Sequence, residues 1–290
     1  MATVHDFEAA AAADSSLLSI WMPKLHELLL DAGWTLEYAD ADAIGTSADP
    51  GVPAWDKTPA ANTDAGIAVY RMPASSHATR WFVRVRPGWA ASTARPHMRG
   101  LQVGVTHDGS GTLTGGNAEQ TPGVTVSQTD NRAWRMNASE DGFFYYAGIG
   151  STTEVVAYVE RIRLLDESVQ DEVIALNRYA LPMGDFVSAT AGVTDWEGKY
   201  VILAANGALS TSVESLDAFC PYADAWVFQG PYWLFGNPLT GLPRLWRQAP
   251  LSHVRANDSV MVNVDGGLKT YKAFSSEFSA MYGVIVVATE

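Results

Sequence analysis

The residues that could perform chemistry are few and scattered along the sequence. Six histidines occur, and no two of them stand in a His-x-x-x-His or His-Glu-x-x-His pattern. The single cysteine, Cys220, lies between Phe219 and Pro221, which is typical of a buried small apolar residue. One cysteine can form neither an intrachain disulfide nor a multi-cysteine zinc site. The sequence therefore predicts no bound metal and no cofactor.

Other combinations of reactive residues have simpler explanations than catalysis. The glycine-rich stretch Gly109–Gly116 lacks the Lys-Ser/Thr pair of a phosphate-binding loop, and no helical pattern follows it. His97, His107 and Asp108 could approach one another around a metal, but an aspartate beside a histidine is more common at an exposed turn. No Gly-x-Ser-x-Gly sequence is present for a nucleophilic serine. These observations favour a protein that is not an enzyme.

Paired carboxylates leave one enzymatic alternative open. Asp130, Glu140 and Asp141 lie near aromatic strand-like segments, as the two carboxyl groups of a glycan-degrading enzyme would. No motif accompanies them. Carboxylates in solvated loops are the preferred interpretation.

The composition favours assembly and argues against nucleic-acid binding. Charged residues make up 18% of the chain, below the usual ~25%, and ten tryptophans are present. Obligate interfaces are likewise poor in charge and rich in Trp and Tyr. The net charge of -13 repels phosphates, so sequence-specific binding to DNA or RNA is not expected. Arg80, Arg84 and Arg86 alternate with apolar residues, which indicates a solvated strand face or pairing with carboxylates.

Aromatic residues in segments rich in glycine and proline are the candidate interface residues. The stretch Gln229–Pro238 has too many such residues for a central strand. Aromatic side chains in such a loop anchor a protein partner or form a platform for a sugar, and the low charge favours the partner. The interface candidates are Trp55, Tyr232, Trp233, Phe235 and Trp246. Recognition of cell-surface glycans through Trp233 is the alternative.

One amphipathic helix and many strands must position these residues. Apolar residues at helical spacing over 17–29 predict a helix that Gly33 ends and that Pro23 either kinks or opens. A weaker helical pattern covers 167–177. The best hairpin signal is Asp265-Gly266 between two β-branched and aromatic runs, and Glu140–Gly142 is a weaker one. Further strands are predicted at 66–72, 80–86, 101–106, 124–128, 133–137, 142–147, 153–165, 200–204, 225–229, 232–235 and 284–288.

The predicted fold class is therefore mainly β, with β-sandwich-like sheets and one N-terminal amphipathic helix. We predict a helix-plus-β-rich domain over 1–180 and a smaller β-rich domain over 181–290, because Leu181-Pro-Met-Gly184 interrupts the strand pattern. The first residues do not form a secretory signal, and no apolar run approaches the ~20 residues of a membrane span. We expect synthesis in a cytoplasm and no membrane contact.

Four segments together resemble the virion structural proteins of tailed bacteriophages. They are the Leu-rich helix that leads into Ala32-Gly-Trp-Thr35, and the segments Trp81–Arg86, Glu140–Tyr145 and Val264–Tyr271. The resemblance implies a non-catalytic subunit of the tail, neck or baseplate. It also implies partners among copies of the chain and other virion proteins, and a location in the virion after synthesis in the host cytoplasm.

Overall fold

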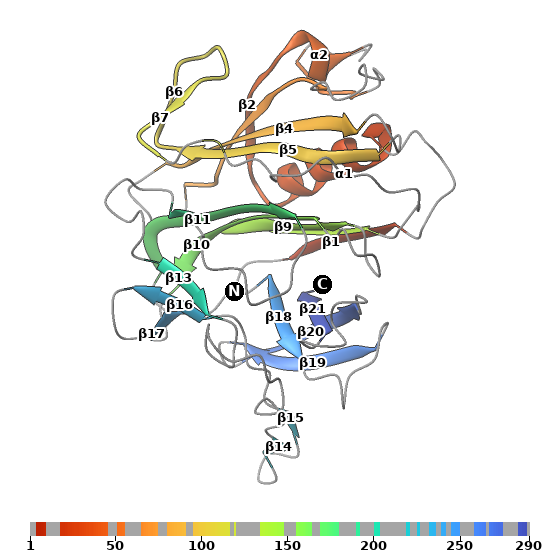
Figure 1. Ribbon diagram of the computed structural model, residues 1–290, viewed down its shortest axis with the longest axis vertical. Coiled ribbons are helices and arrows are strands. Elements are labelled where there is room, and N and C mark those ends of the chain that lie inside the picture. The colour runs from red at the N-terminus through yellow and green to blue at the C-terminus, as the bar shows by residue number, and fades with distance from the viewer. Residues whose placement is uncertain are drawn as a thin grey trace.

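The chain folds into antiparallel sheets with one long helix near its N-terminus, which confirms the predicted mainly β class. The structure is a computed structural model, shown in Figure 1. It describes residues 4–9, 18–45, 51–55, 65–74, 80–90, 95–116, 119, 134–147, 155–163, 169–179, 190–191, 200–203, 219–220, 225–226, 232–235, 239–241, 245–249, 258–264, 267–274 and 284–288. The strand predicted at 124–128 and the candidate carboxylate Asp130 lie outside these residues.

Helix α1 spans Leu18–Asp31 and ends at the predicted glycine. Gly33 has a φ of 86°, a left-handed conformation that favours glycine. Its backbone N–H donates to the Leu30 carbonyl at 2.9 Å, and that of Trp34 donates to the Leu29 carbonyl at 2.9 Å. These two bonds form a Schellman motif, which satisfies the last carbonyls of the helix and turns the chain into the next strand.

Pro23 lies inside α1 without ending it, so the helix does not open at this residue. A proline in a helix removes one backbone hydrogen bond and costs ~3 kcal/mol. Met22, Leu25 and Leu29 are fully buried on one face of the same helix. Because each such side chain contributes ~1.5–3 kcal/mol, burial of this face outweighs the cost of the proline.

The N-terminal four-stranded sheet has the order β2-β3-β4-β5. Its strands are β2 (Thr35–Ala39), β3 (Ala68–Arg71), β4 (Phe82–Ala90) and β5 (Arg95–Gly104). The four-residue helix α2 (Ala41–Ile44) follows β2. Strand β5 leads into the two-stranded hairpin of β6 (Thr106–His107) and β7 (Leu113–Thr114).

The sequence predicted a strand that ends at residue 86, just before Pro87, but β4 extends to Ala90. The strand continues through Pro87, and its register against β5 shifts between Arg86 and Pro87. The pairing passes from Gly100 to Met98 at this point, so Arg99 is the extra residue of a bulge. A proline without an N–H is tolerated at such an interruption of the ladder.

The six-stranded sheet has the order β1-β8-β9-β10-β11-β12. Its strands are β1 (His5–Ala9), β8 (Trp134–Ser139), β9 (Gly142–Ala147), β10 (Val155–Arg163), β11 (Val169–Tyr179) and β12 (Thr190–Ala191). The predicted turn at Glu140–Gly142 is confirmed, because Ser139 pairs with Gly142 across the β8–β9 hairpin.

The helical pattern predicted at 167–177 is wrong, because these residues form most of β11. The segment pairs along its length with the alternating strand β10. Val173 and Ala175 are both fully buried, which is the period-2 burial of a strand. Pairing with β10 thus overrides a local pattern that fits either conformation.

The two sheets and α1 enclose one hydrophobic core. Inner-face residues of the N-terminal sheet, such as Val83 and Val85, join Phe143, Tyr145 and Val159 of the six-stranded sheet in it. Figure 1 shows the N-terminal sheet and the six-stranded sheet as successive layers with α1 alongside. The predicted sandwich-like arrangement is therefore present in this part of the chain.

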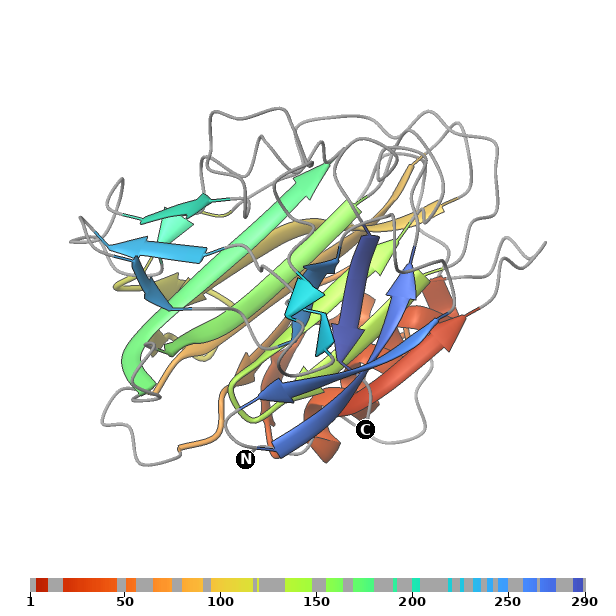
Figure 2. The same ribbon diagram turned by 90° about the horizontal axis from the view of Figure 1, so that it is seen from below.

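C-terminal segments cover the other face of the six-stranded sheet, as Figures 1 and 2 both show. On that face Asn137, Phe144 and Tyr158 are almost fully buried. The Asn137 side-chain amide donates to the carbonyl of Leu245 at 2.9 Å. The boundary predicted near residue 180 stays a prediction, and contacts such as this one cross it.

Three smaller sheets complete the described strands. A three-stranded sheet has the order β13-β16-β17, and a C-terminal four-stranded sheet has the order β18-β21-β20-β19. The strands are β13 (Tyr200–Leu203), β14 (Phe219–Cys220), β15 (Ala225–Trp226), β16 (Tyr232–Phe235), β17 (Leu239–Gly241), β18 (Trp246–Ala249), β19 (Ser259–Val264), β20 (Gly267–Phe274) and β21 (Val284–Ala288). Val264 pairs with Gly267, which confirms the predicted C-terminal hairpin. Strands β14 and β15 pair with each other.

A buried arginine connects the two core sheets. The Arg161 side chain of β10 is fully buried, and its Nη1 lies 3.7 Å from a carboxylate oxygen of Asp141 in the β8–β9 turn. Its Nη2 donates to the carbonyl of Pro73, which follows β3, at 2.9 Å. The Trp34 indole donates to the carbonyl of Ser139 at 2.8 Å near the same turn. These contacts tie the β8–β9 turn to segments of the N-terminal sheet.

We predict that Arg161→Met lowers the free energy of unfolding by about 3 kcal/mol, because it leaves Asp141 buried without this cation. Urea denaturation followed by circular dichroism measures the loss. Arg71→Met is the matched control, since the Arg71–Glu37 pair (3.0 Å) is about one-third exposed and should cost below about 1 kcal/mol. Equal losses in the two variants would contradict a special role for Arg161.

The half-buried His26 predicts a dependence of stability on pH. Its Nδ1 lies 3.0 Å from the hydroxyl of Tyr70, and burial lowers the pKa of His26 below 6.5. The unfolded chain therefore binds a proton more readily, so this contribution is complete above pH 6.5 and is lost as the pH falls. His26→Gln should reduce the loss of stability between about pH 7.5 and about pH 5.5. An unchanged difference between urea midpoints at the two pH values would contradict this prediction.

Candidate functional site

Two arginines on the outer face of the N-terminal sheet form the clearest cluster of charged side chains among the described residues. Successive residues of a strand point to opposite faces, so the burial of Val83 and Val85 places Arg84 and Arg86 together on the other face. Both arginine side chains are about one-fifth exposed. The alternation in the sequence thus produces a pair of neighbouring guanidinium groups that are mostly shielded from solvent.

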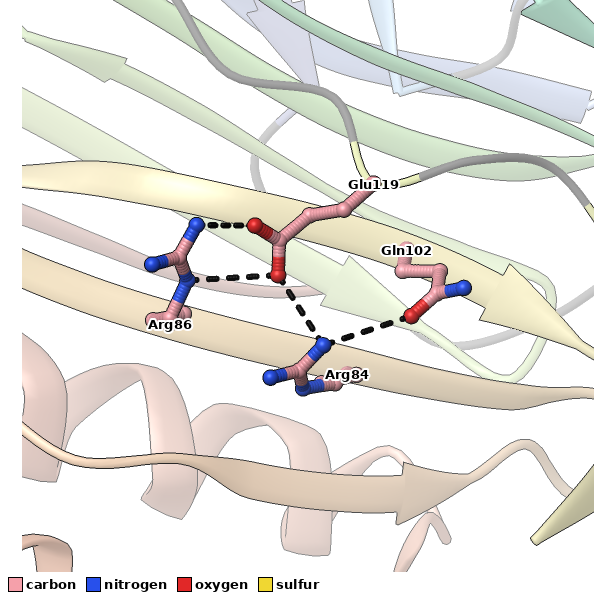
Figure 3. Close-up of polar contacts among 4 residues, drawn as sticks. All are labelled: Arg84, Arg86, Gln102 and Glu119. Atoms are coloured by element: carbon pink, nitrogen blue, oxygen red, sulfur yellow. Dashed lines mark hydrogen bonds and ion pairs between the residues drawn. The ribbon is translucent and has the colours of Figure 1, made fainter. Parts of the chain in front are cut away.

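The carboxylate of Glu119 lies between these two guanidinium groups, as Figure 3 shows. One of its oxygens is 3.1 Å from Nη1 of Arg84 and accepts a hydrogen bond from Nε of Arg86 at 3.2 Å. The other oxygen pairs with Nη2 of Arg86. Arg86 therefore binds the carboxylate with two donors, which is the strongest geometry for an arginine–carboxylate pair.

Strand β5 lies beside the cluster and contributes Gln102 and Gly100 to it. Gln102 accepts a hydrogen bond from Nη1 of Arg84 at 3.4 Å (Figure 3). A Cβ on Gly100 would lie 2.6 Å from Cδ of Glu119 and 2.8 Å from Nε of Arg86. Glycine at this position therefore leaves the space in which the ion cluster sits.

The β6–β7 hairpin packs beside the cluster on the same sheet. The His107 ring lies 5.9 Å from the ring of Tyr38 and 5.9 Å from that of Phe82. The backbone N–H of Gly111 donates to Nε2 of His107 at 3.1 Å, so this nitrogen acts as an acceptor. The hairpin is thus held on the sheet by one histidine that is used structurally.

Asp108 shapes the tip of this hairpin. Its carboxylate accepts hydrogen bonds from the hydroxyl and the backbone N–H of Ser110, both at 2.7 Å, and from the N–H of Thr112 at 3.0 Å. These hydrogen bonds hold the pKa of Asp108 below its usual range, with those from Ser110 contributing most. The turn predicted at this residue is confirmed.

The cluster can bind an anion, and in this structure it binds one from its own chain. Arg84 and Arg86 pair with a carboxylate, which confirms one of the two interpretations of the alternating arginines. Glu119 itself was not predicted as a site residue. The signal was present, because Glu119 is the only charged residue between Asp108 and Asp130, but a lone glutamate does not reveal its partner.

The interface prediction for Trp55 is corrected by the structure. Its side chain is 1% exposed and belongs to the hydrophobic core, so it is not available to a partner. The backbone N–H of Trp55 donates to the Ala43 carbonyl at 3.0 Å, and its φ of 52° is left-handed. The polar residues around it predicted an exposed loop, but the large apolar area of the indole favours burial.

For the other four interface candidates the structure describes the backbone alone. Tyr232, Trp233 and Phe235 lie in β16, and Trp246 lies in β18, so their role at an interface stays a prediction. Strand β16 is the central strand of its sheet, contrary to the prediction that this segment has too many breakers. The glycines and prolines lie outside 232–235, where they do not interrupt its pairing.

Of the three carboxylates proposed for a glycan cleft, Asp130 lies outside the described residues, so the pairing stays a prediction. Asp141 is buried and pairs with Arg161. Asp40, after β2, accepts a hydrogen bond from the Ala43 N–H at 2.8 Å as the N-cap of α2.

Among the described residues, no group of three or more His, Cys, Asp or Glu could hold a metal. No described helix is long and apolar enough to cross a membrane.

The contact between Gly100 and Glu119 gives a testable prediction. Gly100→Ala should lower the free energy of unfolding by about 1–2 kcal/mol, because the added methyl group separates Glu119 from Arg86. In a Glu119→Ala background the same substitution should cost less, since only the contact with Nε of Arg86 remains. Urea denaturation of the four variants forms a double-mutant cycle. Equal costs in both backgrounds would show that the methyl group acts elsewhere.

Comparisons of the chain with models of known protein families, with curated proteins and with solved structures found no match.

Proposed function

We propose that the chain is a non-catalytic structural subunit of a tailed-bacteriophage virion. It assembles in the tail, neck or baseplate by packing against copies of itself and other virion proteins. The resemblance of its helix-Gly-Trp element, its strands and its Asp-Gly hairpin to such subunits gives the class of assembly. The pairing of charged side chains within the chain also supports the proposal.

The observation that carries the proposal is the internal pairing of the few cations. Four described arginines pair with carboxylates of the same chain, and the basic residues number only 19. The four arginines are Arg71, Arg84, Arg86 and Arg161. A cation bound in this way contributes little free charge to the surface. Charged residues are depleted from the centres of protein interfaces, so such a surface suits close packing of subunits.

Three of the described aspartates have structural uses of the same kind. Asp40 caps α2, Asp108 closes the β6–β7 turn and Asp141 joins the two core sheets through Arg161. Each of these groups is held by hydrogen bonds or an ion pair that shapes the backbone around it. This pattern supports a structural role, because these carboxylates stabilise the fold.

The proposal predicts that the purified chain self-associates or binds other proteins of the same virion. Multi-angle light scattering over about 1 to about 100 µM should give masses above that of one 290-residue chain, and the fraction assembled should rise with concentration. The same measurement is repeated with the products of neighbouring genes. A chain that stays monomeric at every concentration and in every mixture would overturn the proposal.

A further inference from the structure

The β6–β7 hairpin follows β5 at one end of the N-terminal sheet (Figure 1). Its tip comprises residues 108–112. The backbone N–H of Gly111 in this tip donates to Nε2 of the His107 side chain at 3.1 Å. A ring nitrogen that accepts a hydrogen bond carries no proton, so the neutral ring holds its proton on Nδ1. The bond to the tip therefore requires a neutral His107.

The same ring connects the hairpin to two strands of the sheet. The centroid of the His107 ring lies 5.9 Å from that of Tyr38 in β2 and 5.9 Å from that of Phe82 in β4. Gly111 is buried with a φ of 95°, and a Cβ on it would lie 2.9 Å from a ring carbon of Tyr38. Gly111 is thus the point at which the tip contacts both the sheet and His107.

A separate network around Asp108 holds the rest of the tip. Its carboxylate accepts hydrogen bonds from the N–H groups of Ser110 and Thr112 at 2.7 Å and 3.0 Å, and its own N–H donates to the Thr112 carbonyl at 3.2 Å. The bonds to the carboxylate hold the pKa of Asp108 below its usual range, with those from Ser110 contributing most. The carboxylate therefore stays charged at the pH values at which a histidine titrates, and this network does not change there.

We infer that His107 is a pH-sensitive switch that holds the hairpin tip against the sheet while its ring is neutral. Histidine ordinarily changes its charge between about pH 5 and about pH 8. Protonation places a proton on Nε2, which then faces the Gly111 N–H, and two donors cannot bond to each other. The tip loses its bond to the ring and separates from Tyr38 as one unit, because Asp108 keeps its internal bonds. This switch does not depend on the proposed function.

The charged groups around the ring do not replace the lost bond. Tyr38 and Phe82 face the ring, and of these two only Tyr38 is titratable. The charged side chains beside them on the sheet already form ion pairs, which are Glu37–Arg71 and Arg84–Glu119. Among the described residues of the hairpin, Asp108 supplies the one carboxylate. It is exposed, so its attraction for a protonated ring is weak.

Hydrogen exchange of the Gly111 amide tests the switch. Its protection factor is the exchange rate of an unstructured peptide divided by that of the protein at the same pH, and NMR of isotope-labelled protein measures it. Loss of the hydrogen bond should lower this factor about fivefold between about pH 7.5 and about pH 5.5. The ring nitrogen chemical shifts of His107, recorded over the same range, report the charge of the ring.

A pair of variants identifies the group that is responsible. His107→Phe keeps an aromatic ring beside Tyr38 and Phe82 but removes the acceptor, so Gly111 protection should be low and equal at both pH values. His26→Gln is the matched control, because His26 contacts Tyr70 of the hydrophobic core. Its Gly111 protection should fall as much as that of the wild type, which separates the switch from a general loss of stability at low pH.

The outcomes decide the inference without reference to assembly. A Gly111 protection factor that stays constant while the His107 ring becomes charged would overturn the switch, and so would a ring that stays neutral down to about pH 5.5. A fall that persists in His107→Phe would assign the pH dependence to another group. Because none of these measurements reports self-association, failure of the switch leaves the proposed function to be decided by light scattering.

Discussion

The burial of Arg161 is the constraint on which the placement of the two core sheets depends. A guanidinium removed from water is costly unless charged and polar groups replace its hydration. Asp141 and the carbonyl of Pro73 provide that replacement, and they come from different sheets. The sheets must therefore keep one mutual position for the arginine to stay satisfied. Trp34 adds a second polar contact near the same turn, through its hydrogen bond to Ser139.

The six-stranded sheet is buried on both faces. One face packs on the N-terminal sheet and α1, and the other is covered by C-terminal segments (Figure 2). A sheet that is covered on both faces needs internal partners for most of the polar groups it carries. The Asn137 amide donates to Leu245, and the Tyr158 hydroxyl donates to Glu160. The Asn137–Leu245 bond connects the second face to the segment that precedes β18, which adds a polar contact to the apolar packing.

Local patterns in the sequence predicted the strands well where their period was unambiguous. Runs of β-branched and aromatic residues predicted β9 and β10, and the glycine after the helical pattern predicted the end of α1 at Gly33. The errors arose where partners distant in sequence decide the outcome. Segment 167–177 is a strand because β10 pairs with it, and β4 continues past Pro87 because a bulge against β5 tolerates the missing N–H. Neither partner can be read from the local residues.

The candidate site shows the same division between local and distant information. Alternation predicts that Arg84 and Arg86 share a face, and a paired carboxylate was one of two expectations for them. The identity of that carboxylate depends on the path of the chain between β7 and β8, which no short-range pattern fixes. Burial of Trp55 is likewise a tertiary property, because a polar loop can either expose its one large apolar side chain or fold over it.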